Sequence, residues 1–425
     1  MSGNSKLRYK IRSQITRFTS RLTRGMGKVK SRFLREMIYG IQAGRDIKVS
    51  NIARELNESI PLIKTENRLC RNLADLDLTE SVNDYLCWEG AGQVRRDTVL
   101  AVDLGDVRKD YAKKMEYMAR VRDGSKGEIA DGYWLCQIVA AHPCEDNITP
   151  LYGELYSQNA EGFHSENAQI LKAVNTVAKA TERRGIVAID RGGDRRSLLI
   201  PLIKNGLRFV VRQEGKRHIV LPGGSLCSVQ KAARWCKSEV ERKIELEKDG
   251  IRKVRKLRLG SLPVKLPERP QEQLWLVVIR GFGKAPVILL TNVVPTPVRK
   301  HCLWIGELYL TRWKCEETYR FLKSTYNLED VRVRSYTGLR NTYALLNAVM
   351  YFVSVVVGAK PRLNIIFKQI CEKAKRFYEI ANFYQYAIAD GIHRLLYASE
   401  GRLTEVKHRD SPHTQTLLNF ARPPS

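Results

Sequence analysis

The chain has 425 residues, of which 43% are hydrophobic, so it is too long for one ordinary core and two to four domains are expected. Its net charge of +28 and pI of about 9.8 indicate a polyanionic partner. No apolar run is long enough to span a membrane, and the basic N-terminus lacks the apolar segment of a secretion signal. The nine cysteines are odd in number and form no CxxC pair, which favours reduced thiols in a cytosolic protein.

The N-terminal segment is strongly basic. Between Lys6 and Arg35 there are eleven Lys or Arg residues and no acid, and apolar residues recur at helical spacing at Leu7, Ile11, Ile15, Phe18 and Leu22. A basic amphipathic helix of this kind binds DNA or a membrane, or is simply solvated. The charge of the whole chain favours DNA.

Residues 33–78 read as helical throughout. Within them, residues 49–56 have the pattern of the first helix of a helix-turn-helix, with Ser50 as its N-cap. Pro61 opens the next helix, whose polar side carries Lys64, Asn67, Arg68 and Arg71. In that motif the second helix enters the major groove of DNA. An ordinary helical bundle fits the same residues equally well.

From residue 98 to 212 the pattern becomes α/β, with strands predicted at 98–104, 133–141, 148–152, 186–190 and 207–211 and helices at 165–184 and 195–205. Asp103 and Asp190 each end a short apolar run, where ligand sites of α/β sheets form. The order of elements is that of a ribonuclease-H-like fold, in which the first and fourth strands are neighbours. The two carboxylates would then lie roughly 5 Å apart and would repel each other without a cation between them. A divalent ion is therefore expected.

Several other residues of this region admit two interpretations. Asp106 and Asp194 follow the two aspartates closely and more simply serve turns or caps. In the basic extension over residues 110–131, four side chains either contact a DNA backbone or are merely solvated: Tyr111, Lys113, Lys114 and Arg120.

Residues 215–296 are strand-rich, with alternation at 253–259, 274–279 and 287–291. The many basic residues there suit a DNA-facing sheet or a solubilising face. Trp235 and Trp275 could stack on an extruded base, although tryptophan is more often part of a core. Beyond this segment, residues 339–357 predict an apolar core helix, residues 360–397 a basic, aromatic helical tail, and residues 411–425 a disordered end.

A helix predicted over residues 309–323 carries the most informative pattern. At about 100° per residue, four groups share one stripe of it: Tyr309, Arg312, Glu316 and Lys323. Glu317 points about 100° away from Glu316. A solvated, salt-bridged face would explain the charges. A carboxylate flanked by cations also suits a metal ion held against a phosphate, and two-metal phosphoryl transfer needs further carboxylates, which Asp103 and Asp190 offer.

These residues resemble a known family. The spacing of Tyr309, Arg312, Glu316 and Lys323 resembles the YREK signature of the insertion-sequence-four family of bacterial DDE transposases. The block beginning Asp190-Arg-Gly-Gly-Asp resembles the surroundings of that family's second aspartate, and Asp103 in Ala-Val-Asp-Leu-Gly-Asp resembles the first. The resemblance extends over roughly residues 30–355. One departure is Gly193, where the family pattern leads us to expect an aromatic residue.

The resemblance implies that Asp103, Asp190 and Glu316 bind two Mg²⁺ ions, for which Mn²⁺ could substitute, and that the chain cleaves DNA and transfers strands. It implies that Tyr309, Arg312 and Lys323 grip phosphates near the scissile bond. The helix-turn-helix residues Lys64, Arg68 and Arg71 would bind the terminal inverted repeats of the transposon. The partners are then double-stranded end and target DNA, bound by a homodimer in the bacterial cytoplasm at the nucleoid, with no membrane.

The expected organisation is a helical DNA-binding domain over residues 1–95, a ribonuclease-H-like core over 96–214 and 301–360, a β-rich insertion over 215–300, and a helical tail over 361–425. The family has such an insertion before its glutamate helix. Two alternatives remain open. One is a metal-dependent nuclease of the same fold without strand transfer, and the other is a helix-turn-helix DNA-binding protein with a decayed catalytic domain.

Overall fold

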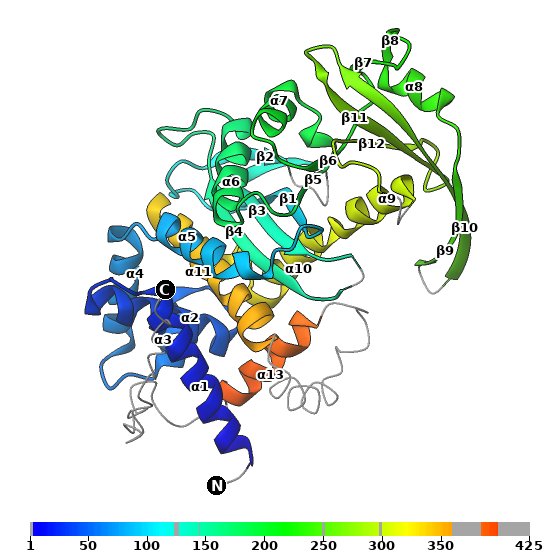
Figure 1. The fold of residues 1–425 in the computed structure, drawn as a ribbon. Coiled ribbons are helices and arrows are strands. Elements are labelled where there is room, and N and C mark those ends of the chain that lie inside the picture. The colour runs from blue at the N-terminus through cyan, green and yellow to red at the C-terminus, as the bar shows by residue number, and fades with distance from the viewer. Residues whose placement is uncertain are drawn as a thin grey trace, which may run out of the picture.

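The computed structural model describes residues 3–122, 127–143, 145–248, 251–296, 300–358 and 384–397. It is a mixed α/β structure built on one large sheet. Figure 1 shows the N-terminal helices and α13 gathered at one end of this sheet and the strands of the insertion at the other, with the core strands between them. None of the helices in the described part of the chain is long and apolar enough to cross a membrane.

The core strands follow the order expected from the sequence. β1 pairs with β3 in antiparallel fashion and with β5 in parallel, β5 pairs with β6 in parallel, and β4 pairs with β3. β1 and the fourth of the expected strands, β5, are therefore neighbours, as in a ribonuclease-H-like core. The strands are β1 (Val99–Arg108), β2 (Ala119–Arg122), β3 (Ile129–Ala141), β4 (Ile148–Tyr156), β5 (Ile186–Ile189) and β6 (Phe209–Arg212).

Two expectations about these strands were wrong. β1 does not end at Leu104, as predicted, but continues to Arg108, because the long strand β3 pairs with it over its whole length. Asp103 is instead the first residue beyond the pairing with β5, which ends at Val102 and Ile189. The short strand β2 lies inside the predicted extension and pairs with the start of β3.

The N-terminal region is helical, as expected, and it is packed on the core. The helices are α1 (Gly3–Leu22), α2 (Lys28–Gly44), α3 (Val49–Leu56), α4 (Leu62–Asp75) and α5 (Thr79–Gly90), followed by η1 (Ala91–Gln93). The five apolar residues of the basic amphipathic helix are all buried, and the Phe18 ring stacks on Tyr351 with centroids 6.0 Å apart. The apolar face of α1 is thus used inside the protein. Ser50 does not cap α3, because the helix begins at Val49 and Lys48 is its N-cap residue.

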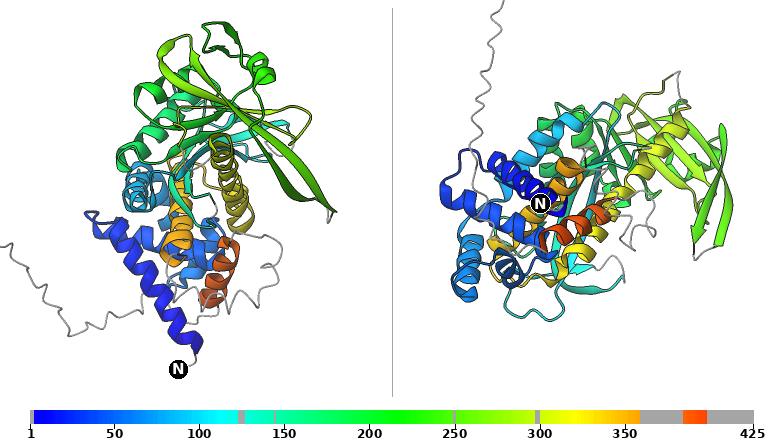
Figure 2. Two further views of the ribbon diagram at one scale, coloured as in Figure 1. Left: turned by 45° about the vertical axis from the view of Figure 1, so that its right-hand side comes forward. Right: turned by 90° about the horizontal axis from the view of Figure 1, so that it is seen from below.

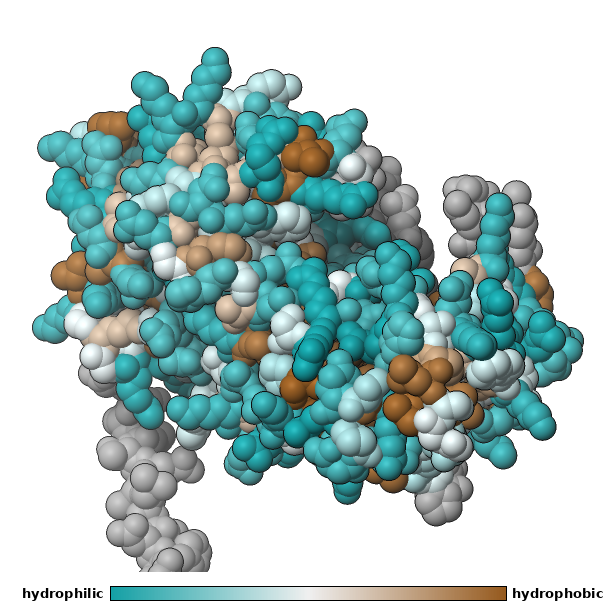
Figure 3. All heavy atoms as spheres, turned by 90° about the horizontal axis from the view of Figure 1, so that it is seen from above, coloured by the Kyte–Doolittle hydropathy of each residue, from teal (hydrophilic) through white to brown (hydrophobic). Residues whose placement is uncertain are grey.

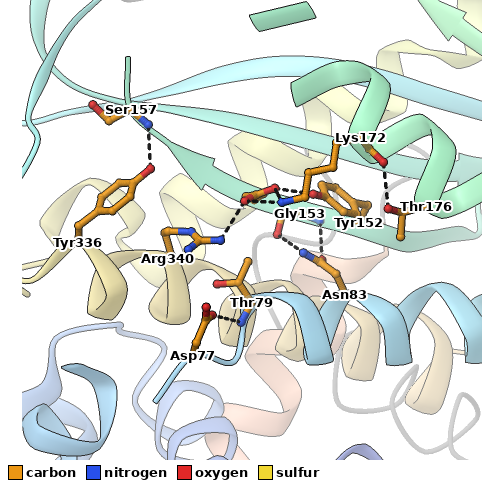
Figure 4. Close-up of polar contacts among 11 residues, drawn as sticks. Asp77, Thr79, Asn83, Tyr152, Gly153, Ser157, Lys172, Thr176, Tyr336 and Arg340 are labelled. Atoms are coloured by element: carbon orange, nitrogen blue, oxygen red, sulfur yellow. Dashed lines mark hydrogen bonds and ion pairs between the residues drawn. The ribbon is translucent and has the colours of Figure 1, made fainter. Parts of the chain in front are cut away.

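A polar network fastens helices to β4, the strand next to β3 (Figure 4). Asn83 of α5 exchanges two hydrogen bonds with the backbone of Gly153, at 3.1 and 2.9 Å, so its amide replaces a neighbouring strand at this edge. The next residue, Glu154, binds Lys172 of α6 (Glu166–Ala180) and Arg340 of α11 (Tyr336–Tyr351). Three helices from distant parts of the chain are therefore fixed against one strand.

The insertion continues the core sheet instead of forming a separate one. β12 pairs with β6, and the order then runs through β11 and β10 to the β7–β8 hairpin, while β9 pairs with β10 as a long arm (Figure 2). The elements are β7 (His218–Val220), β8 (Leu226–Ser228), α8 (Val229–Trp235), β9 (Val240–Lys248), β10 (Ile251–Leu266), β11 (Arg269–Arg280) and β12 (Val287–Thr291).

The remaining helices complete the core. They are η2 (Arg191–Gly193), α7 (Arg196–Lys204), α9 (His301–Thr311), α10 (Trp313–Tyr326), η3 (Leu328–Asp330), α11 with the π-helical segment η4 (Phe352–Val357), and α13 (Gln385–Tyr397). The predicted apolar helix at 339–357 corresponds to α11 and η4, which are almost wholly buried. Of the predicted helical tail, α13 is described and packs on α2, where Arg45 binds Asp390 at 2.6 Å. Residues 361–383 and the predicted disordered end lie outside the described residues.

Candidate active site

The two aspartates predicted from the sequence lie on neighbouring parallel strands. The last register pair of β1 and β5 is Val102 with Ile189, and Asp103 and Asp190 are the next residue on each strand. Asp190 begins the short helix η2, and its Oδ1 accepts a hydrogen bond from the Gly192 backbone N–H at 2.8 Å. The Asp190 carboxylate is close enough to help raise the pKa of Asp103.

The predicted helix over residues 309–323 is interrupted at Arg312, between α9 and α10. The backbone N–H of Arg312 bonds to the Tyr309 carbonyl and that of Cys315 to the Arg312 carbonyl, so the chain tightens there into three-residue turns. The assumption of one straight helix was therefore wrong, and the angular positions of Tyr309 and Glu316 cannot be read from a single helical wheel. Arg312 itself keeps α-helical dihedral angles.

The guanidinium of Arg312 lies between two of the predicted metal ligands. Its Nη2 is 2.5 Å from Glu316 Oε1 and its Nη1 is 3.6 Å from Asp103 Oδ1. The Arg312 side chain is 5% exposed, whereas that of Glu316 is 49% exposed. The Glu316 carboxylate is therefore open to solvent, whereas the Arg312 guanidinium that binds it is buried.

The electrostatics of Asp103 show that this cluster has too little positive charge. Burial, together with the nearby carboxylates of Asp190 and Glu316, raises the pKa of Asp103 to about 7, although Arg312 opposes the shift. Two of the three carboxylates, those of Asp103 and Glu316, pair with the Arg312 guanidinium. The Asp103 carboxylate would gain from another cation. The Nε and Nη1 atoms of Arg312 are buried without a hydrogen-bond acceptor, so the guanidinium would gain from a further acceptor group.

The structure places two of the predicted phosphate-binding residues in the interior. Tyr309 is 3% exposed, and its ring lies against the Arg312 guanidinium with 5.7 Å between the ring centroid and Cζ. Both side chains therefore face protein groups in this arrangement, not solvent. Lys323 is partly exposed and is held by Asp106 at 3.3 Å and Glu329 at 2.8 Å. Asp106 is buried and binds Lys323, so its role differs from the predicted turn or cap.

One residue that the sequence pattern missed, Tyr319, supports Asp103. The Tyr319 hydroxyl donates a hydrogen bond to the Asp103 carbonyl oxygen at 3.0 Å, and its ring would be only 3.0 Å from a Cβ at Gly105. Tyr319 thus fixes α10 against β1. A signal for this contact was present, because Tyr319 follows Glu316 by three residues and lies beside it on the helix.

The predicted helix-turn-helix residues divide into two groups. Arg68 is partly buried and is paired with Glu36 at 2.5 Å and Glu58 at 2.8 Å, whereas Lys64 and Arg71 are exposed on α4. Asn67 is also exposed, and its spacing from Lys64 and Arg71 puts the three on one face. The face available to a partner is therefore Lys64, Asn67 and Arg71, without Arg68.

The unexpected Gly193 has a steric explanation. A Cβ at this position would lie 2.6 Å from Ile189 Cγ2 and 3.2 Å from Val211 Cγ1. Any larger side chain would have to displace β5 or β6. Nearby, Asp194 is neither a metal-ligand candidate nor a simple cap, since its carboxylate binds the Glu214 backbone N–H and Arg217 at 2.7 Å.

One comparison with known proteins agrees with the class of protein that these residues indicate. Residues 160–352, which include Asp190 and Glu316, match a family model described as "Transposase DDE domain". No curated protein matches the chain. Among solved structures it is similar to one entitled "Cryo-EM structure of piggyBac transposase synaptic complex with hairpin DNA (SNHP)", with 10% identity and a TM-score of 0.44 over 92% of this chain and 79% of that chain. The family match supports a transposase of the DDE class.

Proposed function

We propose that this chain is the transposase of a bacterial insertion sequence and that it cleaves DNA and transfers strands at Asp103, Asp190 and Glu316. The observation that carries the proposal is the charge balance around Asp103, whose carboxylate lies near those of Asp190 and Glu316 and pairs with one guanidinium, that of Arg312, which also binds Glu316. The strand order supports it, because it brings Asp103 and Asp190 onto neighbouring strands. The finer assignment to the insertion-sequence-four family rests on the YREK spacing in the sequence.

The donor set fits hard divalent cations. Carboxylate oxygens are the ligands that Mg²⁺ and Mn²⁺ prefer, and the cluster lacks positive charge. In the part of the chain that is described, no three His, Cys, Asp or Glu side chains are grouped tightly enough to hold a metal ion. Asp103 and Glu316 are both in contact with Arg312, so metal binding requires that the guanidinium give up at least one of them. Two bound Mg²⁺ ions would supply Lewis-acid activation of the attacking and leaving oxygens.

The chain's own residues orient the reaction. Tyr319 and Arg312 hold Asp103 and Glu316 in place before the metal binds. Once released from a carboxylate, the Arg312 guanidinium carries two free donor groups that suit the oxygens of a phosphate. Lys323, further along α10, would contact the next phosphate. These side chains position the scissile phosphodiester, and the buried setting of Arg312 limits access of bulk water.

Double-stranded DNA would reach the site over a basic, polar surface. Hydrophilic side chains cover most of the face seen in Figure 3, as a net charge of +28 leads one to expect. Lys64 and Arg71 on α4 would bind the terminal inverted repeats. Joining two transposon ends requires two active sites, so we propose a homodimer on DNA. The reaction would take place in the bacterial cytoplasm, at the nucleoid.

The proposal is tested with the Glu316→Gln variant of the full chain. The variant should bind end-containing DNA normally but lose Mg²⁺-dependent cleavage by more than about 100-fold, since even groups that only orient metal ligands cost about 10- to 100-fold. Glu317→Gln is the matched control, because Glu317 is paired with Arg320 at the surface and should be replaceable. Cleavage by the Glu316→Gln variant at a near wild-type rate would refute the assignment.

A further inference from the structure

A cleft with a volume of about 730 Å³ lies at the Lys323 end of the candidate active site. One wall is formed by residues 108–115, which follow β1, and the other by residues 329–334, which follow α10. Lys323 connects the cleft to the active site, because it binds Glu329 on the second wall and Asp106 on β1. A DNA strand that passes Glu316 and then Lys323 would next meet this cleft.

The two walls are fixed to each other at both ends. At one end the buried Lys109 ammonium donates to the backbone carbonyl oxygens of Glu329, at 2.6 Å, and Val331. At the other end the backbone N–H of Glu116 donates to the Arg334 carbonyl at 3.0 Å, and the Glu116 carboxylate accepts from the Tyr336 N–H at 2.7 Å. The cleft therefore exists before any ligand binds.

The acids that line the cleft are already neutralised. Each of the three is paired with a basic side chain: Asp110 with Arg108, Glu329 with Lys323, and Asp330 with Lys48. Several of the basic side chains that line the cleft, by contrast, have no acidic partner in the described part of the chain. Among the described residues, Lys113, Lys114 and Arg334 make no ion pair, and Arg332 acts on Asp330 only at longer range. The cleft thus presents uncompensated positive charge, which suits phosphate groups.

The size of the cleft selects one strand of DNA. A volume of about 730 Å³ corresponds to a cube with an edge of about 9 Å, whereas the major groove of a duplex alone is about 12 Å wide. A duplex therefore cannot enter, but the backbone of a single strand can. Tyr111 is 95% exposed at this cleft and offers a ring on which an unpaired base can stack.

We propose that this cleft binds an unpaired DNA strand next to the reacting phosphate. Lys113, Lys114 and Arg334 contact its phosphates and Tyr111 stacks on one of its bases. The inference rests on the proposed function, because it assumes that DNA lies at Glu316. It adds that the strand leaving on the Lys323 side is separated from its complement.

The test compares two DNA probes of arbitrary sequence: a blunt duplex, and the same duplex with an unpaired extension on either strand. Binding of the full chain is measured by fluorescence anisotropy over a range of salt concentrations. The wild-type protein should bind one of the extended duplexes more tightly than the blunt one. The Lys113→Gln/Lys114→Gln variant should lose that advantage, with a fall of about tenfold or more at 0.1 M salt, because each lost single-strand contact removes about 0.7 from the salt slope.

Two further variants make the result specific. Lys179→Gln/Lys204→Gln removes the same charge from exposed positions on α6 and α7 that do not line the cleft, and should leave the advantage intact. Tyr111→Ala should lower affinity for the extended duplex only, by about tenfold, without changing the salt slope. Equal losses for blunt and extended duplexes in the Lys113→Gln/Lys114→Gln variant would overturn the proposal, as would a wild-type protein that shows no preference for an extension.

These outcomes are separate from those that test the catalytic assignment. If Glu316→Gln still cleaves DNA while the preference for an extension is present and depends on Lys113 and Lys114, the cleft is supported and the metal-ligand assignment fails. If Glu316→Gln abolishes cleavage but no preference exists, the assignment stands and the cleft proposal is refuted.

Discussion

Two buried carboxylates on the core strands, Glu154 on β4 and Asp103 on β1, have opposite surroundings. Glu154 accepts hydrogen bonds from Lys172 at 2.9 and 3.0 Å, from Arg340 at 3.0 Å and from the Tyr152 hydroxyl. Burial alone would raise the pKa of Glu154, but Lys172, Tyr152 and Arg340 outweigh it and lower the pKa. The Glu154 carboxylate is therefore paired with two cations, Lys172 and Arg340.

Around Asp103 the ratio is reversed. Asp103 has one cation, Arg312, and two further acids, Asp190 and Glu316, in its surroundings, and burial together with these acids raises the pKa of Asp103 to about 7. The two regions use the same residue types at similar depth, so burial of charge does not distinguish them. The two clusters differ in the balance between their acidic and basic side chains. The Glu154 network is complete and fastens helices to the sheet, whereas the Asp103 cluster lacks positive charge and is suited to bind it.

The largest stability effect is expected at Glu154. Glu154→Gln leaves Lys172 and Arg340 without their acid, which should lower the free energy of unfolding by about 3 kcal/mol, the lower end of the range for a broken buried pair because Lys172 is half exposed. Urea unfolding measures the change. Glu317→Gln breaks a surface pair and should cost less than about 0.5 kcal/mol. A Glu154→Gln variant as stable as the wild type would show that this network contributes nothing to the free energy of unfolding.

The second prediction concerns added Mg²⁺. At ten times its dissociation constant, Mg²⁺ should raise the free energy of unfolding of the wild-type protein by about 1.4 kcal/mol, because it binds only the folded chain. Glu154→Gln should keep this increment and Glu316→Gln should lose most of it. Thermal unfolding with and without Mg²⁺ makes the measurement without any cleavage assay. If Mg²⁺ stabilises Glu154→Gln and Glu316→Gln equally, the assignment of Glu316 as a metal ligand is wrong.

A smaller effect is expected at Lys323. Lys323→Ala should cost about 1 kcal/mol of stability, because the buried Asp106 carboxylate loses this cation while the other partner, Glu329, is partly solvated. Cleavage and strand transfer should fall, while the Mg²⁺ increment should be unchanged because Lys323 touches neither Asp103 nor Glu316. Assays on a pre-nicked end substrate separate cleavage from strand transfer. Full strand transfer by the Lys323→Ala variant would mean that Lys323 has no role in the reaction.

The last prediction is a pH dependence of stability at Lys109. Burial lowers the pKa of Lys109 to about 8 from an ordinary value of 10.5, despite the nearby Asp330 and Glu329. The folded state therefore releases this proton first, so the contribution of Lys109 to stability is fully present above about pH 10.5 and is lost as pH falls through about 8. The stability of the wild-type protein relative to Lys109→Met should thus increase between pH 8 and pH 10. Urea unfolding of both proteins at these pH values measures it, and a constant difference would contradict the shift.

The sequence predicted those features that depend on local pattern. Apolar runs located β1 and β5, and the order of elements placed Asp103 and Asp190 on neighbouring strands, because a strand order follows from few topological rules. The features that it did not predict depend on partners far along the chain. Arg312 is drawn to Asp103 on β1, and Arg68 is held by Glu36 and Glu58 on other elements. A helical wheel contains no information about either contact.

The cleft shows the same limit. Lys113 and Lys114 were recognised from the sequence as candidate DNA contacts, with solvation as an equal alternative. What favours binding is that residues 329–334 form the opposite wall and that every acid there already has a cation. Gly193 is another feature that the sequence alone could not explain, since only the positions of Ile189 and Val211 in the structure show why no side chain fits there.

The pairing of β12 with β6 also has a consequence for the timing of assembly. The Thr291 hydroxyl donates to the carbonyl oxygen of Phe209, 82 residues earlier, and α9 and α10 follow β12 directly. A ribosome therefore has to complete the whole insertion before Glu316 even emerges, and until then β6 is an open edge with unpaired backbone groups. Sequence separation of this size makes closure of the sheet slow. If Asp103, Asp190 and Glu316 form the proposed catalytic site, a nascent chain would spend seconds with both aspartates in place and no glutamate, and could not cut DNA while it is still being made.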